Sequence, residues 1–474
     1  MGKLNYVNNV INKLNDMSLS IFESFNSYIK KLRVKKKITN NAYINEYNVC
    51  DIFGIVINSC NDNTTLRDSA NKNSNFNDSH LSTMYYWLKK VYDTDILDDM
   101  YYKIYQFSEC IDKSIFISCN DQLTNIYKNY NVLAGDGTIS NVSFKNDHGK
   151  NIASYTNSII MNTLTNLVYD HRIQFDNNEL KGILDTKLTK SDIIILDRGY
   201  SKLAFMNKLA GRTNFVIRLT KNLLIYKKFM KTNKNYMTIK HNGYNIKLIK
   251  YLVDNNTRNI IKNRYANDKG EEDNDKFFVI ATNLTDLSFD QITQLYKKRW
   301  SIEVCNKYIK SNFNIRHIVR QYNSSQPIKK ISFYASLSIL LYNIIMLEKI
   351  LLERKYYYEH QKMTEYNFSK NVTLYKQYLI DSVNPCNKKI LLSKKQKEHR
   401  LTVNKRSKLK KKNTNNNKKR GKYKSLDKMV KLNNRDDIIL QIKEYYKKIK
   451  KINNSRQNKI VLMKIMNINS NNTT

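Results

Sequence analysis

The chain has 474 residues and a mass of 56.2 kDa, so it exceeds one average domain and can bury a substantial core. Lysine and arginine number 82 against 41 aspartate and glutamate residues, and the formal charge of +41 indicates a polyanionic partner such as DNA, RNA or an anionic membrane. The six cysteines form no Cys-x-x-Cys pair, which argues against a structural zinc site. Because no secretory signal is present, we expect reduced thiols and an intracellular protein.

Residues 1–128 predict a helical, basic N-terminal domain. Aromatic residues stand beside lysines at helical spacing, as in the run from Tyr101 to Tyr105. Such a pattern fits a helix that contacts DNA, but it is more common in helices that bury the aromatic face and expose the basic one. DNA binding by this domain is therefore a hypothesis, and a purely structural role stays open.

Residues 129–352 predict an α/β or α+β domain. The run Asn131–Ala134 leads into Gly135-Asp136-Gly137, which is typical of a strand that ends in a turn. The apolar run at 192–196 predicts a buried strand that ends at Asp197. The other expected elements are strands at 158–162, 164–172 and 214–219, and a helix at 203–209 closed by Gly211.

Residues 221–276 interrupt this domain and predict a β-rich insertion. The segments 236–240 and 244–253 flank Asn242-Gly243, which is a strong signal for a hairpin. An acidic loop at 271–275 ends the insertion. The expected elements after it are a strand at 277–282 and a long helix at about 289–312.

Pro327 opens an apolar helix, at a position that suits proline. Residues 331–347 carry no charge, but they include three serines and an asparagine, and the run is just short of a membrane-spanning helix. It therefore predicts a buried helix of a soluble core, and no membrane partner.

Residues 353–474 predict a basic C-terminal region. Between 388 and 428 the only acids are Glu398 and Asp427, which indicates a disordered arm that binds DNA. A nuclear localisation signal and disorder without function are the alternatives. A short amphipathic helix is expected at 436–452.

Asp136 and Asp197 each follow an apolar strand, and they are the first candidates for chemistry. Two acids at the rim of one sheet would repel each other unless a cation lay between them. Mg²⁺ and Mn²⁺ supply that charge and take hard oxygen ligands. The alternative is that both are turn formers, since Asp-Gly and Asp-Arg-Gly are ordinary turn sequences. The strand pattern alone leaves these alternatives evenly balanced.

The helix at 289–312 favours the metal site. At about 100° per residue, its residues Tyr296, Arg299, Glu303 and Lys310 fall within a stripe roughly 60° wide. A second, apolar stripe beside it would pack on the sheet. The alternative for the polar stripe is a solvated face, with Arg299 and Glu303 as an ordinary i,i+4 ion pair.

The spacing Tyr296-x2-Arg299-x3-Glu303-x6-Lys310 resembles the Y-R-E-K signature of the insertion-sequence-four family of DDE transposases. Asp136 in Gly-Asp-Gly-Thr and Asp197 in Leu-Asp-Arg-Gly-Tyr resemble the first and second aspartate motifs of that family. The resemblance covers about residues 130–352. The N- and C-terminal parts of the chain show no matching motif.

The resemblance implies a ribonuclease H-like core, which is a mixed five-stranded sheet with helices on both faces, interrupted by the insertion before the last catalytic helix. It implies that Asp136, Asp197 and Glu303 are the catalytic residues and bind two Mg²⁺ or Mn²⁺ ions. In such a site no covalent protein–DNA intermediate is required.

The resemblance also implies DNA contacts. Tyr296, Arg299 and Lys310 would bind phosphates at the end of the mobile element, where arginine suits bidentate contact and lysine acts as a point charge. Arg198 and Arg218 are lesser candidates, for a structural or a generic phosphate contact.

The expected function is that of a cut-and-paste DNA transposase with double-stranded DNA ends and target DNA as partners, assembled as a homodimer and associated with DNA inside the cell. A ribonuclease H-like nuclease without strand transfer is one alternative. A domesticated or inactive transposase that only binds DNA is another.

Overall fold

The computed structural model describes most of residues 2–361, all within one compact unit, residues 1–403. The segments described are 2–35, 96–117, 121–145, 151–175, 178–252, 277–313 and 327–361, with Tyr92, Glu365, Tyr366, Phe368, Ser369 and Val372. The predicted acidic loop at 271–275, the basic arm at 388–428 and the helix at 436–452 lie outside the described residues.

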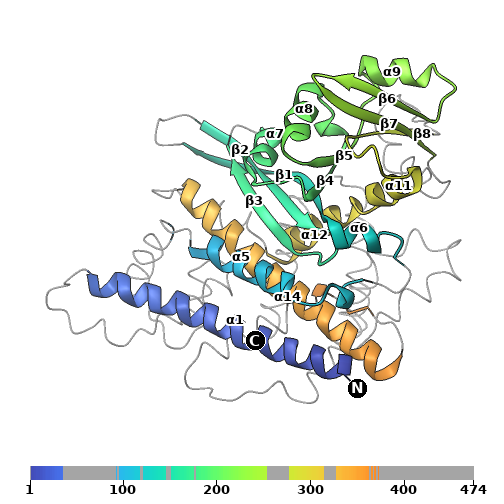
Figure 1. The fold of residues 1–474 in the computed structure, drawn as a ribbon. Coiled ribbons are helices and arrows are strands. Elements are labelled where there is room, and N and C mark those ends of the chain that lie inside the picture. The colour runs from blue at the N-terminus through green and yellow to red at the C-terminus, as the bar shows by residue number, and fades with distance from the viewer. Residues whose placement is uncertain are drawn as a thin grey trace, which may run out of the picture. The chain divides into compact units, whose positions relative to one another are not determined.

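The described residues contain one mixed sheet of eight strands (Figure 1). Its order is β3-β2-β1-β4-β5-β8-β7-β6, in which β1, β4 and β5 are parallel neighbours and every other pairing is antiparallel. The strands are β1 (Asn131–Lys145), β2 (Asn151–Asn162), β3 (Val168–Gln174), β4 (Asp192–Leu196), β5 (Asn214–Arg218), β6 (Tyr236–His241), β7 (Tyr244–Leu252) and β8 (Phe277–Thr282).

The five-stranded sheet implied by the resemblance is too small. The insertion forms the predicted hairpin, in which Asn242 and Gly243 have φ of 48° and 82°, as a two-residue turn requires. Its second strand, β7, then pairs with β8 along six residue pairs, so the hairpin extends the central sheet. Without the insertion β8 would be an edge strand, whose unpaired backbone groups can bind a further strand. The residue pattern of the insertion does not reveal this pairing.

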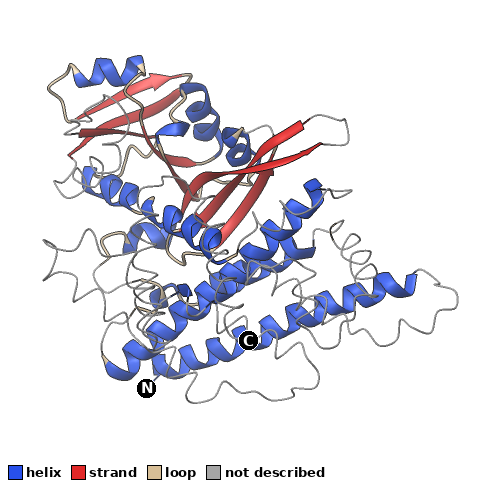
Figure 2. Ribbon diagram, turned by 180° about the vertical axis from the view of Figure 1, so that it is seen from behind, coloured by secondary structure: helices blue, strands red, loops and turns tan. Residues whose placement is uncertain are grey.

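Helices cover both faces of the sheet, because its central strands are apolar on both sides (Figure 2). Alternate residues of β4 enter different cores, so Ile193 and Ile195 face one layer while Ile194 and Leu196 face the other. The first layer contains α5 (Ile96–Glu109), α6 (Thr124–Asn129), α11 (Phe289–Lys297), α12 (Trp300–Asn312) and α14 (Pro327–His360); the second contains α7 (Glu179–Asp185), α8 (Leu203–Arg212) and α9 (Leu224–Met230).

β1 does not end in a turn at Asp136, as the sequence predicted, but continues to Lys145 along β2. Its glycines serve close packing. A Cβ on Gly135 would lie 2.8 Å from Leu196 Cδ2, and one on Gly137 would lie 2.5 Å from Glu179 Cδ. Glycine in a strand therefore marks close approach of other groups here, and no turn.

Two other predicted boundaries move. The strand predicted at 164–172 begins at Val168, because Asn166 adopts a positive φ of 54° and the Asn162 side chain accepts hydrogen bonds from the amides of Leu164 and Thr165. The helix predicted to close at Gly211 continues to Arg212.

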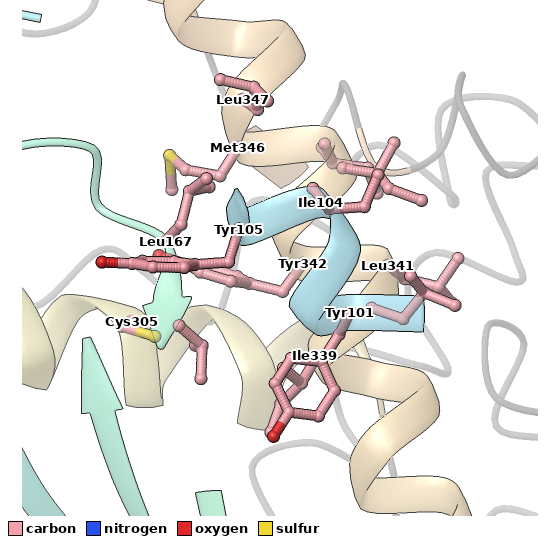
Figure 3. Close-up of a cluster of buried hydrophobic side chains, with 14 of the residues drawn as sticks. Tyr101, Ile104, Tyr105, Leu167, Cys305, Ile339, Leu341, Tyr342, Met346 and Leu347 are labelled. Carbon is pink, nitrogen blue, oxygen red and sulfur yellow. The ribbon is translucent and has the colours of Figure 1, made fainter. Parts of the chain in front are cut away.

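The apolar helix α14 is buried, as predicted. Within the described part of the chain it is the one helix long and apolar enough to span a membrane, and 89% of its apolar window is buried inside the protein. It packs against α5 and against α1 (Gly2–Lys35) in one core. Figure 3 shows Tyr101, Ile104 and Tyr105 of α5 crossing over α14 in this core. The boundary predicted after residue 128 thus divides helices that share a core, and it stays a prediction.

Candidate active site

The strand register brings the two predicted aspartates together. β1 and β4 run parallel, and their last paired residues are Ala134 and Ile195. Continuing that register by two residues places Asp136 beside Asp197, which directly follows β4 and precedes the short helix η4 (Arg198–Tyr200). Asp136 therefore lies at the edge where the parallel strand β4 ends, although its own strand β1 continues beyond it.

Glu303 lies on α12, which is separate from α11. The sequence predicted one helix over 289–312, but the chain tightens at Lys298 and Arg299. The amide of Arg299 donates to the carbonyl of Tyr296 at 3.1 Å, three residues back, and the amide of Ile302 donates to that of Arg299 at 3.2 Å. Since residues three apart eclipse in such a turn, Arg299 remains on the same side as Tyr296 despite the break.

Packing fixes the direction of α12. Its apolar residues Ile302, Cys305 and Ile309 are at most 5% exposed and enter the core formed with α5 and α14. Figure 3 shows Cys305 in this core with Tyr342 of α14. With that face buried, Glu303 is held beside the sheet rim that carries the two aspartates.

Arg299 connects the three acids. Its guanidinium donates to the Glu303 carboxylate at 2.5 Å, and the two side chains are 15% and 31% exposed. Burial raises the pKa of Asp136, and Arg299 opposes this shift. Burial by itself lowers the pKa of the Arg299 guanidinium, but Tyr296, Asp197 and Glu303 raise it overall. One cation is thus shared among three carboxylates.

Tyr296 is directed inward. It is 7% exposed, and its hydroxyl lies 3.5 Å from Asp197 Oδ1. Burial, followed by the charge of Asp197, raises the pKa of this phenol to about 12, so it stays protonated at neutral pH. As the structure stands, Tyr296 contacts an active-site acid; its predicted phosphate contact remains a prediction.

Asn306 is a site residue that the sequence interpretation missed. It is 6% exposed, and its amide donates to Asp136 Oδ2 at 2.9 Å. Its Oδ1 has no hydrogen-bond partner among the described residues. The available signal was its place three residues after Glu303, on the same side of the helix.

The negative charge of Asp136 is only partly compensated. Burial raises its pKa to about 6, and Glu179 and Asp197 add to the shift, while Arg299 and Asn306 oppose it. A carboxyl group in this condition gains from any additional positive charge placed near it.

The comparisons with known proteins bear on this part of the chain. Residues 127–325 match the family model described as Transposase DDE domain. Over this region the chain is similar to that domain. The match spans all three acids, the insertion and the α12 helix.

No curated protein matches this chain. Among solved structures, the chain is similar to one described as the cryo-EM structure of piggyBac transposase synaptic complex with hairpin DNA, at 11% identity over 79% of this chain and 80% of that one, with a TM-score of 0.38. A TM-score of this size does not establish a common fold.

The three remaining predicted site residues are Arg218, Arg198 and Lys310. Arg218 at the end of β5 stacks on Phe278, 3.5 Å from the ring centre, and acts on the pKa of Tyr296. Arg198 is exposed directly after Asp197, and Lys310 is exposed farther along α12. The structure therefore places Arg218 near Tyr296, which in turn contacts Asp197, while Arg198 and Lys310 are exposed.

The donor atoms of Asp136, Asp197 and Glu303 suit a hard divalent cation in their chemistry, because they are carboxylate oxygens with a deficit of positive charge. Within the described residues, however, no three Asp, Glu, His or Cys side chains are grouped closely enough to hold one ion together. Glu303 is turned to Arg299. The three acids therefore suit a divalent cation in their chemistry, but among the described residues they are not arranged around one ion.

Proposed function

We propose that this protein is a DNA transposase that cuts the ends of a mobile element and joins them to target DNA by metal-dependent, in-line phosphoryl transfer. The observation that carries the proposal is the meeting of Asp136, Asp197 and Glu303 around Arg299, inside a region that matches the transposase DDE domain. A structural role alone would not require three acids to share one partly buried cation.

Two features support assignment to the insertion-sequence-four family and to a ribonuclease H-like fold. The Y-R-E-K spacing from Tyr296 to Lys310 indicates the insertion-sequence-four family. The strand order β3-β2-β1-β4-β5, with three antiparallel strands followed by two parallel ones, supports a ribonuclease H-like core.

Each site residue has a task in this chemistry. Asp136, Asp197 and Glu303 would hold divalent Mg²⁺ or Mn²⁺ ions, and bound ions would supply positive charge to the attacking and leaving oxygens at the scissile phosphate. The Asn306 amide fixes the Asp136 carboxylate, and the Tyr296 hydroxyl orients Asp197, so that both keep one rotamer.

DNA is the partner in this proposal, as transposon ends and as target. Arg299, once released from Glu303, contacts a DNA phosphate, and Lys310 on the exposed side of α12 contacts another. The protein acts as a homodimer that bridges two DNA ends, and it is found where DNA is in the cell.

The proposal is tested with the DNA that flanks the gene. Purified protein, Mn²⁺ and a labelled duplex carrying one flank are incubated with a supercoiled target plasmid. A transposase nicks the duplex at the element boundary and joins the new end to the plasmid. Nicking without joined product identifies a nuclease, and binding without nicking identifies a protein that has lost catalysis; either result would overturn the proposal.

A further inference from the structure

The segment that follows Asp197, residues 198–252, contains no aspartate or glutamate. It contains 13 lysine and arginine residues, whereas the whole chain has 41 acids for 82 bases. In the structure this segment forms η4, α8, β5, α9 and the hairpin of β6 and β7 (Figure 1). The positive charge of these elements therefore has no acid within its own segment to pair with.

Some of these cations serve the fold. Lys247 on β7 donates to two backbone carbonyls in the turn before α11, at 3.2 and 3.0 Å. Lys250 donates to the carbonyl of Thr232 and lies 5.0 Å from the ring centre of Phe229, so it holds the end of α9 against β7. These two lysines have structural partners, and their charges need no external ligand.

Five other cations of the segment are exposed. Arg198 and Lys202 follow Asp197 closely, and Lys227, Lys228 and Lys231 lie on or directly after α9. Within the part of the chain that the structure describes, none of these five side chains is paired with an acid. Lys227 and Lys231 are four residues apart, a spacing at which like charges destabilise a helix. These charges therefore oppose folding unless an anion binds them.

The chain before α9 is fixed at the rim of the sheet that carries Asp136 and Asp197. The amide of Thr220, two residues after β5, donates to Ser201 Oγ at 3.4 Å, and the two hydroxyl oxygens are 3.2 Å apart. Ser201 itself lies four residues after Asp197. The loops after β4 and β5 are thus joined, and α9 starts from the second of them.

The end of α9 is fixed at the same rim. Lys250, which holds Thr232, is the register partner of Val279 on β8. The carbonyl of Val279 accepts from the amide of Leu219, the first residue after β5. α9 therefore extends along the rim from the end of β5 to β7.

The exposed cations lie close enough together for one ligand. In the strand order β4-β5-β8-β7, three steps of about 4.8 Å separate the residues after β4 from the end of α9, or roughly 14 Å. DNA advances about 3.4 Å per base pair, so about four base pairs cover this length. One duplex can contact both groups of cations at once.

We propose that Arg198, Lys202 and the three lysines of α9 form a phosphate-binding row that holds duplex DNA along the rim, from Asp197 outward to β7. The inference rests on the proposed function, since it names the surface on which the same DNA lies. Lysine binds phosphate as a point charge, and phosphate contacts position a duplex without reading its sequence. The row therefore supplies affinity and orientation, and sequence recognition lies elsewhere.

Duplex binding in EDTA tests this apart from metal binding and cleavage. The affinity of a labelled duplex that carries the element boundary is measured by fluorescence anisotropy over a range of salt concentrations, and Tm reports folding. The row variants are Lys202→Gln and the combined Lys227→Gln, Lys228→Gln and Lys231→Gln. The control removes the same charge as the combined variant from exposed lysines on other elements, by Lys103→Gln, Lys128→Gln and Lys187→Gln together.

Each phosphate contact contributes about 0.9 to the slope of log affinity against log salt. We expect the combined α9 variant to flatten this slope by about two to three and to weaken binding by about tenfold or more, with Tm unchanged or raised. Lys202→Gln flattens it by about one. The control changes the slope less than half as much as the α9 variant. Equal slopes for the α9 variant and the control would overturn the inference and leave the proposed function standing. A wild-type protein that binds no duplex would overturn both.

Discussion

Arg299 donates to Glu303 at 2.5 Å within the first turn of α12, while its charge also acts on Asp136. In this arrangement a protein cation supplies part of the positive charge that the acids require. The Glu303 oxygen that accepts from Arg299 cannot bind a metal ion at the same time. If Glu303 binds a metal, as proposed, the ion pair must break and Arg299 is released.

Arg299→Gln changes metal affinity and catalysis in opposite directions. Loss of the guanidinium removes a charge that repels a divalent ion and frees Glu303, so we expect Mn²⁺ affinity to rise several-fold, since even about 1.4 kcal/mol is tenfold in affinity. DNA cleavage falls by about tenfold or more, because the proposed contact of Arg299 with a DNA phosphate is lost. Isothermal titration and a nicking assay check the two effects; Arg299→Lys keeps the charge and is the control. A parallel fall of both quantities would contradict the coupling.

Asp136→Asn stabilises the metal-free protein at pH 7. Because burial and the neighbouring acids raise the folded pKa of Asp136 to about 6, the folded state binds this proton more tightly than the unfolded state. Wild-type stability therefore falls as pH rises from about 4 to 6. With EDTA present, urea unfolding gives a gain of up to about 3 kcal/mol for the variant at pH 7 and no gain below pH 4. A gain that does not depend on pH argues against this origin.

Substitution of two helical glycines by alanine should change the free energy of unfolding in opposite directions. Gly182→Ala places a methyl group 2.6 Å from Ser158 Cβ, and we expect a loss of about 1–3 kcal/mol in the free energy of unfolding. Gly211→Ala in α8 meets only the Tyr244 hydroxyl end, at 3.0 Å, and gains helix propensity of up to about 1 kcal/mol. Urea denaturation of both variants measures this. Equal effects would show that α7 does not pack against β2 as described.

Asp98 joins α5 to the sheet and to α14. Its carboxylate accepts from the Ser336 hydroxyl at 2.5 Å and lies 3.4 Å from His171 Nε2. Burial alone raises the pKa of Asp98, but His171, Ser336 and Arg172 lower it overall. The stability it adds is therefore present above about pH 4 and is lost as pH falls through the folded pKa.

Asp98→Asn should cost about 1 kcal/mol at pH 7, discounted because the side chain is 49% exposed. The cost shrinks toward pH 3. Asp99→Asn on the exposed neighbour is the matched control and should leave the free energy of unfolding unchanged. A similar loss in both variants would assign the effect to the charge of α5 as a whole.

The sequence predicted those features that depend on neighbouring residues, such as the apolar strand before Asp197 and the spacing of the residues around Glu303. The strand at 192–196 is uniformly apolar, and the spacing from Tyr296 to Glu303 survives the helix break because a tighter turn keeps residues three apart in line. The glycines on either side of Asp136 led to a wrong prediction of a turn. Gly135 and Gly137 lie within β1, where residues far along the chain leave no room for a side chain.

The missed residues depend on tertiary contacts. Asn306 could be suspected from its helical spacing to Glu303. Nothing in the local sequence links Glu179 to Asp136, because that proximity is created by Gly137 and Gly182 on different elements. Likewise, the sheet has eight strands because β7 pairs with β8. The residue pattern of a strand does not show which other strand it pairs with.

The central claim is that Asp136, Asp197 and Glu303 form one metal-dependent catalytic centre for DNA cleavage. The most direct measurement compares nicking and binding of a flank duplex with Mn²⁺ by Asp136→Asn, Asp197→Asn and Glu303→Gln. We predict that each variant loses nicking by on the order of a thousandfold or more, while affinity for the duplex changes little. Nicking that persists within tenfold of wild type in Asp197→Asn would contradict the account.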